Sequence, residues 1–317
     1  MDNRERKIEQ YKALIKAFAD PCEGVVYHYT SAQGLRGIIE NNEIWLTNTE
    51  FVNDTTECKA LQNEKDLFSR NELENGYVKE HWCRFIKRPD ASNDTYIASF
   101  SRGKESLDQW RAYGNFRIGF HVKKLAKRHF FLYECLYHKQ KIKDWILQKE
   151  RVKEWEGNCL DDQFKRVAAF NLMYTAQMKY KNESYANEQE VRLIVVSNHK
   201  WDDYDCPSMY EDDPPIHFRD HPVLKTPVPY AKFFIEKEKE QENNHVEEPL
   251  RETERQMKER KLKEEKEVRR ERLPIKEILI GPMLNQEEAK IACDILLCEK
   301  GYENVKVTAS DIPYRGF

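Results

Sequence analysis

Two carboxylates precede an apolar strand-like run in the stretch YANEQEVRLIVVSN. Because side chains alternate along a strand, Glu188, Glu190 and Arg192 are expected to share one face, at the start of a strand buried in mid-sheet. A glycosidic bond that breaks toward a cation needs a carboxylate for the developing charge, and a second carboxylate on that face can act as general base. The alternative is an ion-paired strand end, in which Arg192 neutralises Glu190.

A second set of polar side chains lies in the segment Val25 to Glu57. An apolar run of strand character ends in His28 and Tyr29. Thr30 and Gln33 then have the spacing of a capping box that begins a short helix. This density of polar groups beside apolar strands is typical of a site, although a single histidine is more often a satisfied core residue.

The chain after that helix offers further acid and amide groups. A second strand is expected from Ile44 to Thr47, followed by a polar loop with Asn53 and Asp54. Glu57 lies one turn further along a helix expected from Asp54 to Phe68. These three polar residues also have an ordinary explanation, because Asn-Asp favours a turn and a cap, and Glu is favoured in a first helical turn.

Hydroxyl and aromatic groups follow in the middle of the chain. Thr95–Ser101 has strand character, and alternation places Ser99 and Ser101 on one face near its end. A short helix with Trp110 and Tyr113 comes next and is expected to end at a glycine. By default the serines end their strand and the two aromatic residues pack.

The rest of the chain supplies the scaffold. We expect Phe116–Val122 and Phe130–Tyr137 to be paired strands, and Lys139–Lys181 to form two helices divided at Gly157 and Asn158. Trp201–Pro222 has the composition of a surface loop. The remaining expected elements are a strand at Val228–Ile235 and a strand-helix-strand unit formed by Ile275–Ile280, a helix from Asn285 to Cys298, and Val305–Thr308.

The composition limits the class of protein. The chain has 317 residues, 39% hydrophobic and 12% aromatic, which is ample for a buried core. The net charge of -3 is the difference between 53 basic and 56 acidic residues, so no global field attracts nucleic acid or membrane. Eight scattered cysteines without CxxC spacing indicate reduced thiols, so neither a disulfide framework nor a metal site is expected. Without a signal peptide or an apolar span, we expect no membrane association and a cytoplasmic location.

Three kinds of segment divide the chain. Residues 1–24 are expected to form an N-terminal amphipathic helix. Residues 236–272 consist mostly of Glu, Lys and Arg, so they are expected to form a solvated helical insertion, with a partner-binding arm as the alternative. Residues 25–235 and 273–317 then form a single α+β domain around the insertion.

Several common motifs are absent, since the chain has no GxGxxG after a strand, no phosphate-binding GK[ST] loop, no HExxH and no GxSxG. The order of the motifs HYTS, ND with a Glu three residues later, SFS, DxWxxY, ExExR and IGP resembles the bacterial domain of unknown function 2971. The resemblance runs from about Val25 to the C-terminus and is interrupted by the insertion. That family in turn resembles the ADP-ribosyltransferase fold, whose sites combine a first-strand His or Arg, a middle Ser or Tyr, and a late Glu, often second in an [EQ]xE pair.

The resemblance implies that NAD is the substrate and assigns roles by position. Glu190 would hold the nicotinamide ribose and stabilise the cationic state formed as nicotinamide leaves. Glu188 would activate the acceptor nucleophile, and His28 would hydrogen-bond a ribose. Ser99 would support the nicotinamide pocket, and Tyr113 or Trp110 would stack on the nicotinamide ring. The other NAD-binding candidates at this corner are Tyr29, Thr30, Asn53 and Ser101.

We therefore expect an α+β fold with a mixed, mostly antiparallel split sheet flanked by helices, as in ADP-ribosyltransferases. The expected function is NAD-dependent ADP-ribosyl transfer to a protein or nucleic-acid acceptor, in the toxin or phage-defence setting that the resemblance implies. One alternative is an NAD glycohydrolase that uses the same site with water as acceptor. The other is a non-catalytic binding module of the same fold, with the charged insertion recruiting a partner.

Overall fold

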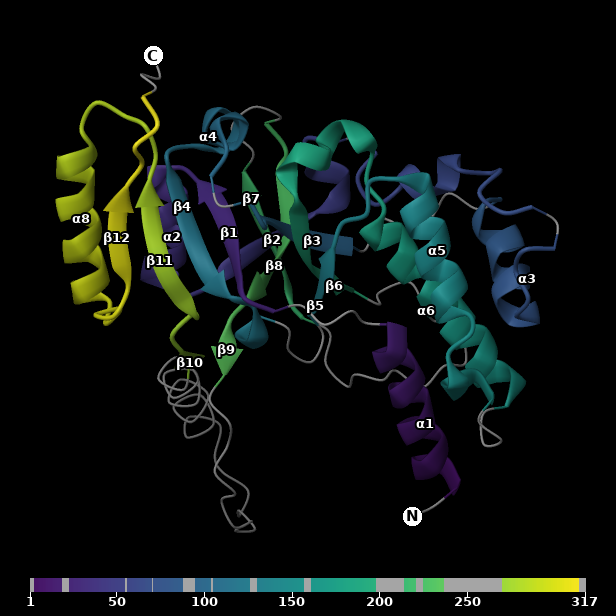
Figure 1. Cartoon of the computed structure of the whole chain (residues 1–317). Helices are drawn as coiled ribbons and strands as arrows, with labels where there is room; N and C mark the ends of the chain where they lie inside the picture. The colour runs from purple at the N-terminus through teal and green to yellow at the C-terminus, as the bar shows by residue number, and fades with distance from the viewer. Residues whose placement is uncertain are drawn as a thin grey trace, which may run out of the picture.

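The computed structural model describes residues 3–18, 23–54, 56–69, 71–87, 95–103, 105–125, 130–156, 161–197, 214–220, 225–236 and 270–313. In this part of the chain the fold is α+β, and its main element is an open, mostly antiparallel sheet, as predicted (Figure 1). The strand order is β12-β11-β4-β1-β3-β2-β8-β7, and β6 joins β3 to β5. The strands are β1 (Val25–Thr30), β2 (Ile44–Asn48), β3 (Thr95–Ser101), β4 (Phe116–His121), β5 (Phe131–Glu134), β6 (Glu190–Val196), β7 (Ile216–Asp220), β8 (Pro227–Phe233), β11 (Ile275–Ile280) and β12 (Lys306–Ala309).

Strand β3 is the point at which the sheet divides. It pairs with β6 along its whole length, from Thr95 opposite Val196 to Ser101 opposite Glu190. On its other edge it pairs with β1 at one end and with β2 at the other. Since β1 and β2 share one edge of β3, the two halves of the sheet diverge between them. This is the split that the sequence led us to expect.

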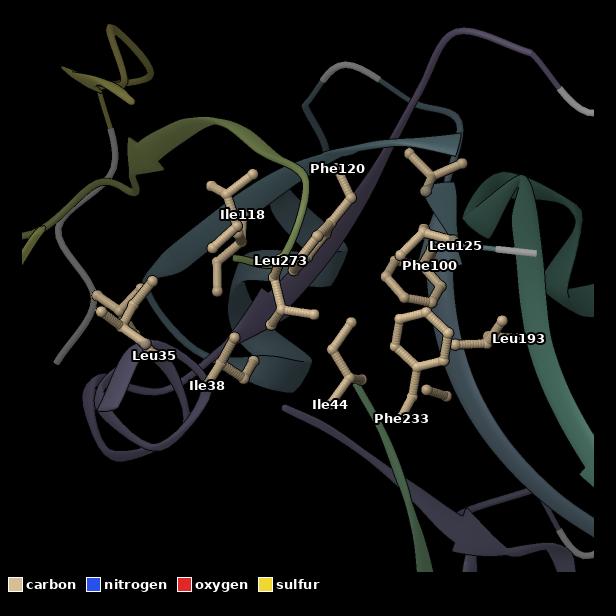
Figure 2. Packing of buried hydrophobic residues seen from close by; sticks show 14 of the residues in the cluster. Leu35, Ile38, Ile44, Phe100, Ile118, Phe120, Leu125, Leu193, Phe233 and Leu273 are labelled. Atoms are coloured by element: carbon tan, nitrogen blue, oxygen red, sulfur yellow. The ribbon is translucent and has the colours of Figure 1, made fainter. Parts of the chain in front are cut away.

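Apart from α4, which packs on β1, the helices lie in two groups (Figure 1). α2 and α8 pack with the alternate apolar residues of the strands into one core, in which Leu35, Ile118, Phe120 and Phe233 are buried (Figure 2). α1, α3, α5 and α6 build a second core together with the segment that contains Ala60 and Leu61, and Leu14 and Phe18 of α1 are buried in it. The helices are α1 (Asn3–Phe18), α2 (Ala32–Asn41), α3 (Gly76–Phe85), α4 (Leu107–Tyr113), α5 (Lys139–Lys149), α6 (Asp162–Lys179) and α8 (Gln286–Glu299).

Local sequence signals place most boundaries of these elements correctly. Helix α2 ends at Asn41 because Asn42 adopts a left-handed conformation with φ of 54°, which asparagine tolerates well. Its N-cap is Ser31 rather than Thr30, since the Ser31 hydroxyl accepts a hydrogen bond of 3.2 Å from the Gly34 amide. The predicted capping box is therefore wrong by one residue.

Three predicted elements differ from the structure. Instead of a helix over Asp54–Phe68, the chain makes turns and one short 3-10 helix, Ala60–Asn63. β4 and β5 do not pair with each other, because β4 lies between β1 and β11 whereas β5 adds to the far edge of β6. The expected loop from Trp201 contains strand β7, whose residues pair with β8 at the edge of the sheet. The division at Gly157 and Asn158 lies outside the described residues.

Most of the charged insertion, residues 237–269, also lies outside the described residues. Its two ends are β9 (Ile235–Glu236) and β10 (Arg270–Glu271), which pair antiparallel with Glu236 opposite Arg270. The division of the chain into helix, domain and insertion stays a prediction. Among the described residues, no helix is long and apolar enough to cross a membrane.

We expect residues 237–269 to be dispensable for folding. Replacing them with Asn-Gly should leave the thermal unfolding midpoint close to that of the full chain, because a two-residue turn fits an antiparallel pair and the removed sequence has little apolar surface to bury. Calorimetry of both proteins measures this. Leu273→Ala is the comparison, because it truncates a side chain that is 2% exposed and so shows how far the unfolding midpoint falls when core packing is lost. Loss of cooperative unfolding in the deletion would contradict the prediction.

Candidate functional site

The start of β6 brings charged side chains from three parts of the chain together. We call Glu57, Lys181, Glu188, Glu190 and Arg192 the charge cluster. Lys181 Nζ lies 2.8 Å from Glu188 Oε2, 2.8 Å from Glu190 Oε2 and 3.6 Å from Glu57 Oε2. Arg192 Nη2 lies 3.2 Å from Glu190 Oε2 and also pairs with Glu57. The two carboxylates that the sequence singles out therefore converge on one ammonium group.

Glu188 reaches the cluster without being part of the strand. It ends a 3-10 helix, Glu183–Glu188, and Gln189 then turns the chain in a left-handed conformation with φ of 43°. β6 begins only at Glu190. The alternation that predicted a shared strand face for Glu188 and Glu190 is therefore wrong at Glu188, because the intervening turn breaks the period of two.

Ser101 and Gln109 hold the Glu188 turn in place. The Ser101 hydroxyl donates a hydrogen bond of 2.6 Å to the carbonyl oxygen of Glu188 and accepts one of 3.0 Å from the Gly103 amide. Gln109 Nε2 donates to the same Glu188 carbonyl at 3.4 Å. Ser101 is 2% exposed, and both of these hydrogen bonds of its hydroxyl hold the turn that carries Glu188.

The cluster is closed from solvent except at Glu188. Glu57, Glu190 and Arg192 are 5%, 3% and 0% exposed, whereas Glu188 is half-buried. Burial by itself would raise the pKa of Glu190, but the charges of Arg192 and Lys181 and hydrogen bonds from Lys181 and Ser99 lower it to about 2. Burial and the nearby Glu190 raise the pKa of Glu57 against the opposing effect of Arg192 and Lys181. Glu190 is therefore ionised throughout the neutral range.

Arg192 anchors the cluster to the core between the sheet and α6. Its Nη1 donates a hydrogen bond of 2.6 Å to the carbonyl oxygen of Met178 and lies 3.8 Å from Cys58 Sγ. Burial disfavours its charge, but the surrounding acidic groups raise its pKa well above the ordinary value. The ion pair between Arg192 and Glu190, which the sequence left open as the alternative, is present.

One oxygen of Glu190 has unused hydrogen-bonding capacity. The salt bridges from Lys181 and Arg192 all go to Oε2, and Cys135 Sγ lies 3.5 Å from the same atom. Oε1 is buried and has no hydrogen-bond partner of normal geometry within the described residues, although Ser99 is near enough to influence the pKa. A buried carboxylate oxygen without a donor costs free energy that a ligand hydroxyl could recover.

Tyr113 stands at the open side of the cluster. It ends α4, is 42% exposed, and its hydroxyl lies 3.4 Å from Glu188 Oε1. Burial of the hydroxyl and the adjacent Glu188 carboxylate raise its pKa to about 12, so the phenol keeps its proton at neutral pH. Its ring is an accessible aromatic surface next to the two carboxylates, and the part-exposed ring of Tyr185 lies 4.6 Å from Lys181 Nζ.

The other aromatic candidates are packing residues. Trp110 is 3% exposed, its ring packs edge-on against Tyr29 at 4.7 Å between centroids, and its Nε1 donates to Glu105 at 3.1 Å. A side chain at Gly281 would collide with the same indole ring. The Tyr29 hydroxyl accepts a hydrogen bond of 3.1 Å from the Ser106 amide. Trp110 and Tyr29 thus fix α4 against β1 and have no free surface for a nicotinamide ring.

The contacts of Thr30 and of Asn53 involve no residue of the charge cluster among those that the structure describes. Thr30 ends β1, and its hydroxyl fills the space beside Gly34 in the first turn of α2. Asn53 is exposed, while Asp54 accepts hydrogen bonds from the amide and hydroxyl of Thr56 at 2.8 and 2.7 Å. The Asn-Asp pair is therefore the turn that its residue types favour.

His28 reaches Ser99 but does not share the face of Glu190. Tyr27 is opposite Ser101 and Ser101 is opposite Glu190, so these side chains share one face of the sheet. His28 points to the other face, opposite Ile118, with its ring 5.7 Å from that of Phe100. Ser99 and Glu190 are therefore brought together, and the side chain of His28 is not.

The hydrogen bond of His28 fixes its tautomer. Nδ1 lies 2.9 Å from the carbonyl oxygen of Ser99, which can only accept, so Nδ1 carries the proton. Burial lowers the pKa of His28 despite this bond, so the ring is neutral at pH 7 and Nε2 is an acceptor. In this position the ring links β1 to β3 where the sheet begins to split.

We expect the lowered pKa of His28 to appear in the pH dependence of stability. The unfolded ring binds a proton below about pH 6.5, whereas the folded ring resists it, so the free energy of unfolding should fall as pH drops below that value. His28→Asn keeps a donor for Ser99 and cannot titrate. Urea unfolding between pH 7.5 and 5 should therefore show a smaller loss for His28→Asn than for the unchanged chain. Equal losses would contradict the prediction.

Of the charge cluster, Lys181 was not found as a site residue from the sequence, and Glu57 was noted among the polar groups near His28 but was given no role. Lys181 follows α6 by two residues and looks like the end of a helix, and Glu57 looks like an acidic residue of a first helical turn.

Comparison of the chain with protein-family models, with curated proteins and with solved structures finds no match. No group of three or more His, Cys, Asp or Glu side chains within the described ranges is arranged to hold a metal ion.

Proposed function

We propose that the protein uses NAD as a substrate and transfers its ADP-ribosyl group to a macromolecular acceptor, a protein or a nucleic acid. The observation that carries this proposal is the convergence of Glu188 and Glu190 on Lys181, with Oε1 of Glu190 buried and without a hydrogen bond of normal geometry to any residue that the structure describes. A fixed carboxylate with one free oxygen suits a ribose hydroxyl, and a second carboxylate beside it suits an acceptor.

The reaction divides the work between the two carboxylates. The bond between the ribose carbon and nicotinamide breaks, and nicotinamide leaves with the electron pair, so positive charge develops on the ribose. Glu190, already ionised, stabilises that charge through Oε1. The acceptor nucleophile bonds to the same carbon and gives its proton to Glu188, which is the more exposed of the two.

The neighbouring residues prepare this arrangement. Lys181 and Arg192 hold Glu190 through Oε2, which directs Oε1 away from both cations. Ser101 positions Glu188 through its main chain, and Tyr113 presents an exposed ring on which nicotinamide can stack. His28 is assigned a positioning role through Ser99 instead of a direct contact with ribose. The toxin or phage-defence setting is part of the same proposal.

A non-catalytic binding module of the same fold is the second candidate. It is favoured by the closed ion pairs around Glu190, which are also what a structural strand end requires, and by the orientation of His28 away from that face. In this case the charge cluster would stabilise the junction of β6 and α6 and would have no substrate.

Incubation with NAD labelled in its adenine ring, with and without a cell lysate, separates these functions. Label transferred to protein or nucleic acid supports the proposed transfer. Release of free ADP-ribose without transfer identifies an NAD glycohydrolase. Absence of any turnover, together with an unchanged unfolding midpoint in millimolar NAD, would leave the binding module and overturn the proposal.

A further inference from the structure

The end of the sheet formed by β2, β8 and β7 carries aromatic and basic side chains on one face. Register places Thr47, Tyr230 and His217 in one row across the three strands. Trp45 lies opposite Lys232, and Arg219 lies opposite Val228. We call the side chains of this surface the aromatic face: Trp45, Thr47, His217, Arg219, Tyr230 and Lys232.

The aromatic face points away from the hydrophobic core. The alternate residues of the same strands, such as Ile44, Leu46 and Phe233, are buried in the core on the opposite side. Trp45 is 37% exposed, Arg219 is exposed, and His217 and Lys232 are half-buried. Tyr230 is 7% exposed, so the accessible aromatic surface of this face is the indole of Trp45 together with the half-buried His217.

The rings and the cation form one ordered stack. Trp45 stacks on Tyr230 with ring centroids 4.4 Å apart and an angle of 29° between the ring planes. His217 lies 5.5 Å from the same tyrosine ring. The Arg219 guanidinium lies 5.7 Å from the Trp45 ring and 6.0 Å from the Tyr230 ring, and it donates a hydrogen bond of 2.9 Å to Thr47 Oγ1. These contacts hold the indole in one orientation, so a flat ligand would bind without reordering it.

The charge on this surface is positive in balance. Glu43, 4% exposed, is the acid beside the stack, and it is paired with Lys232 at 2.9 Å and with Arg270 at 3.5 Å. Glu43 Oε1 also accepts a hydrogen bond of 2.7 Å from Trp45 Nε1. Arg219 has no carboxylate partner within the part of the chain that the structure describes. Lys232 and Arg270 therefore share the carboxylate of Glu43, and the guanidinium of Arg219 is left for a ligand.

We propose that the aromatic face binds single-stranded nucleic acid. A base can continue the stack by lying on Trp45, while Arg219 faces the phosphates and Lys232 stays paired with Glu43. Aromatic stacking beside a basic side chain is how sequence-tolerant single-strand binding is built. An acidic peptide would satisfy the cations but would leave the indole surface without a flat partner. Three strands span about 10 Å, enough for two or three nucleotides.

This site is independent of the charge cluster, and its experiment does not require NAD. Fluorescence anisotropy with labelled 12-nucleotide RNA and DNA strands, single and duplex, measures binding at several salt concentrations. We expect single strands to bind with dissociation constants on the order of micromolar in low salt, more tightly than duplexes, and more weakly as salt rises. A preference for RNA or for DNA identifies the natural ligand.

Variants connect the binding to this face. Trp45→Ala should weaken binding by roughly fivefold or more, and Trp45→Phe, which keeps a ring on Tyr230, should lose less. Arg219→Gln should reduce the slope of log affinity against log salt by about 0.7. Leu284→Ala, at an exposed side chain elsewhere, is the control. Unfolding midpoints of all four variants show whether each is folded.

Several outcomes would overturn the proposal. One is the absence of binding to every strand in low salt at a protein concentration on the order of 100 μM, far above the expected dissociation constant. Another is equal binding by Trp45→Ala, Trp45→Phe, Arg219→Gln and the unchanged chain, which would move the contact to another part of the molecule. Competition by an acidic peptide as effective as that by an unlabelled strand would identify an acidic protein as the ligand instead.

Discussion

Arg192→Met is expected to lower the free energy of unfolding by about 3–5 kcal/mol, the usual cost of removing one partner from a buried ion pair. The substitution keeps an unbranched side chain of similar length. It leaves Glu57 and Glu190, both nearly inaccessible, with Lys181 as their remaining cation among the described residues. It also removes the donor to the Met178 carbonyl, which ties β6 to the end of α6.

Urea unfolding followed by tryptophan fluorescence measures this loss. Arg36→Met is the matched control, because Arg36 pairs with Glu40 at 3.5 Å on an exposed helix surface and its loss should cost about 0.5 kcal/mol or less. Adding Glu57→Gln to Arg192→Met should restore part of the stability, since one of the uncompensated acids is removed. A loss for Arg192→Met no larger than that for Arg36→Met would show that water reaches the cluster.

The local elements of the fold could be predicted because their signals are contained within a few residues. The strand at Thr95–Ser101 and the short helix with Trp110 and Tyr113 occur where the alternation of side chains and the closing glycine predicted them. The strand-helix-strand unit at the C-terminus is also confirmed, with β11 and β12 parallel and α8 between them. In each case neighbours along the chain supply the partners.

Contacts between distant segments could not be predicted in the same way. β5 was expected beside β4 because it follows it in sequence, but its apolar residues are buried next to β6. Glu57 was expected in the first turn of a helix, whereas a tight turn held by Asp54 directs it to Arg192. The sequence does not indicate which buried acidic side chain will pair with which buried basic side chain. Ion pairs of this kind can be identified only once the fold is known.

The candidate site illustrates the same limit. The sequence placed Glu190 and Arg192 on one strand face, and the structure has them 3.2 Å apart through Oε2 and Nη2. It also placed His28 at the end of a neighbouring strand, but the face on which a strand residue lies depends on register, and register is set by pairing with β3 and β4. A shift of one residue would have put His28 on the same face of the sheet as Glu190, across β3 from it. The residues at strand ends could therefore be found from the sequence, but the face of the sheet on which the His28 side chain lies relative to Glu190 could not.

Glu190→Gln is expected to reduce NAD turnover by roughly a hundredfold or more, if the proposed function is correct. Glutamine has the same shape and keeps an oxygen to accept a hydrogen bond, but it lacks the charge that stabilises the ribose cation. The ionised state of Glu190 at neutral pH makes the loss of charge complete. Stability should fall as well, because Lys181 and Arg192 lose a shared partner.

Glu188→Gln is the matched comparison, two residues away and on the same ammonium group. It should impair transfer to an acceptor and leave slow NAD hydrolysis, because only the proton acceptor for the nucleophile is lost. It should cost less stability than Glu190→Gln, since Glu188 is half-buried and its main-chain bonds from Ser101 and Gln109 remain. The pair of variants therefore separates two roles within one cluster.

Turnover and unfolding measured together on the two variants decide between an enzyme and a binding module. In an enzyme, Glu190→Gln loses turnover at temperatures far below its own unfolding midpoint, so the loss cannot be attributed to unfolding. In a module, both variants change the unfolding midpoint in proportion to the burial of the residue, and there is no turnover to lose. If NAD is consumed and Glu190→Gln consumes it at the unchanged rate, the charge cluster is structural and the chemistry lies elsewhere in the chain.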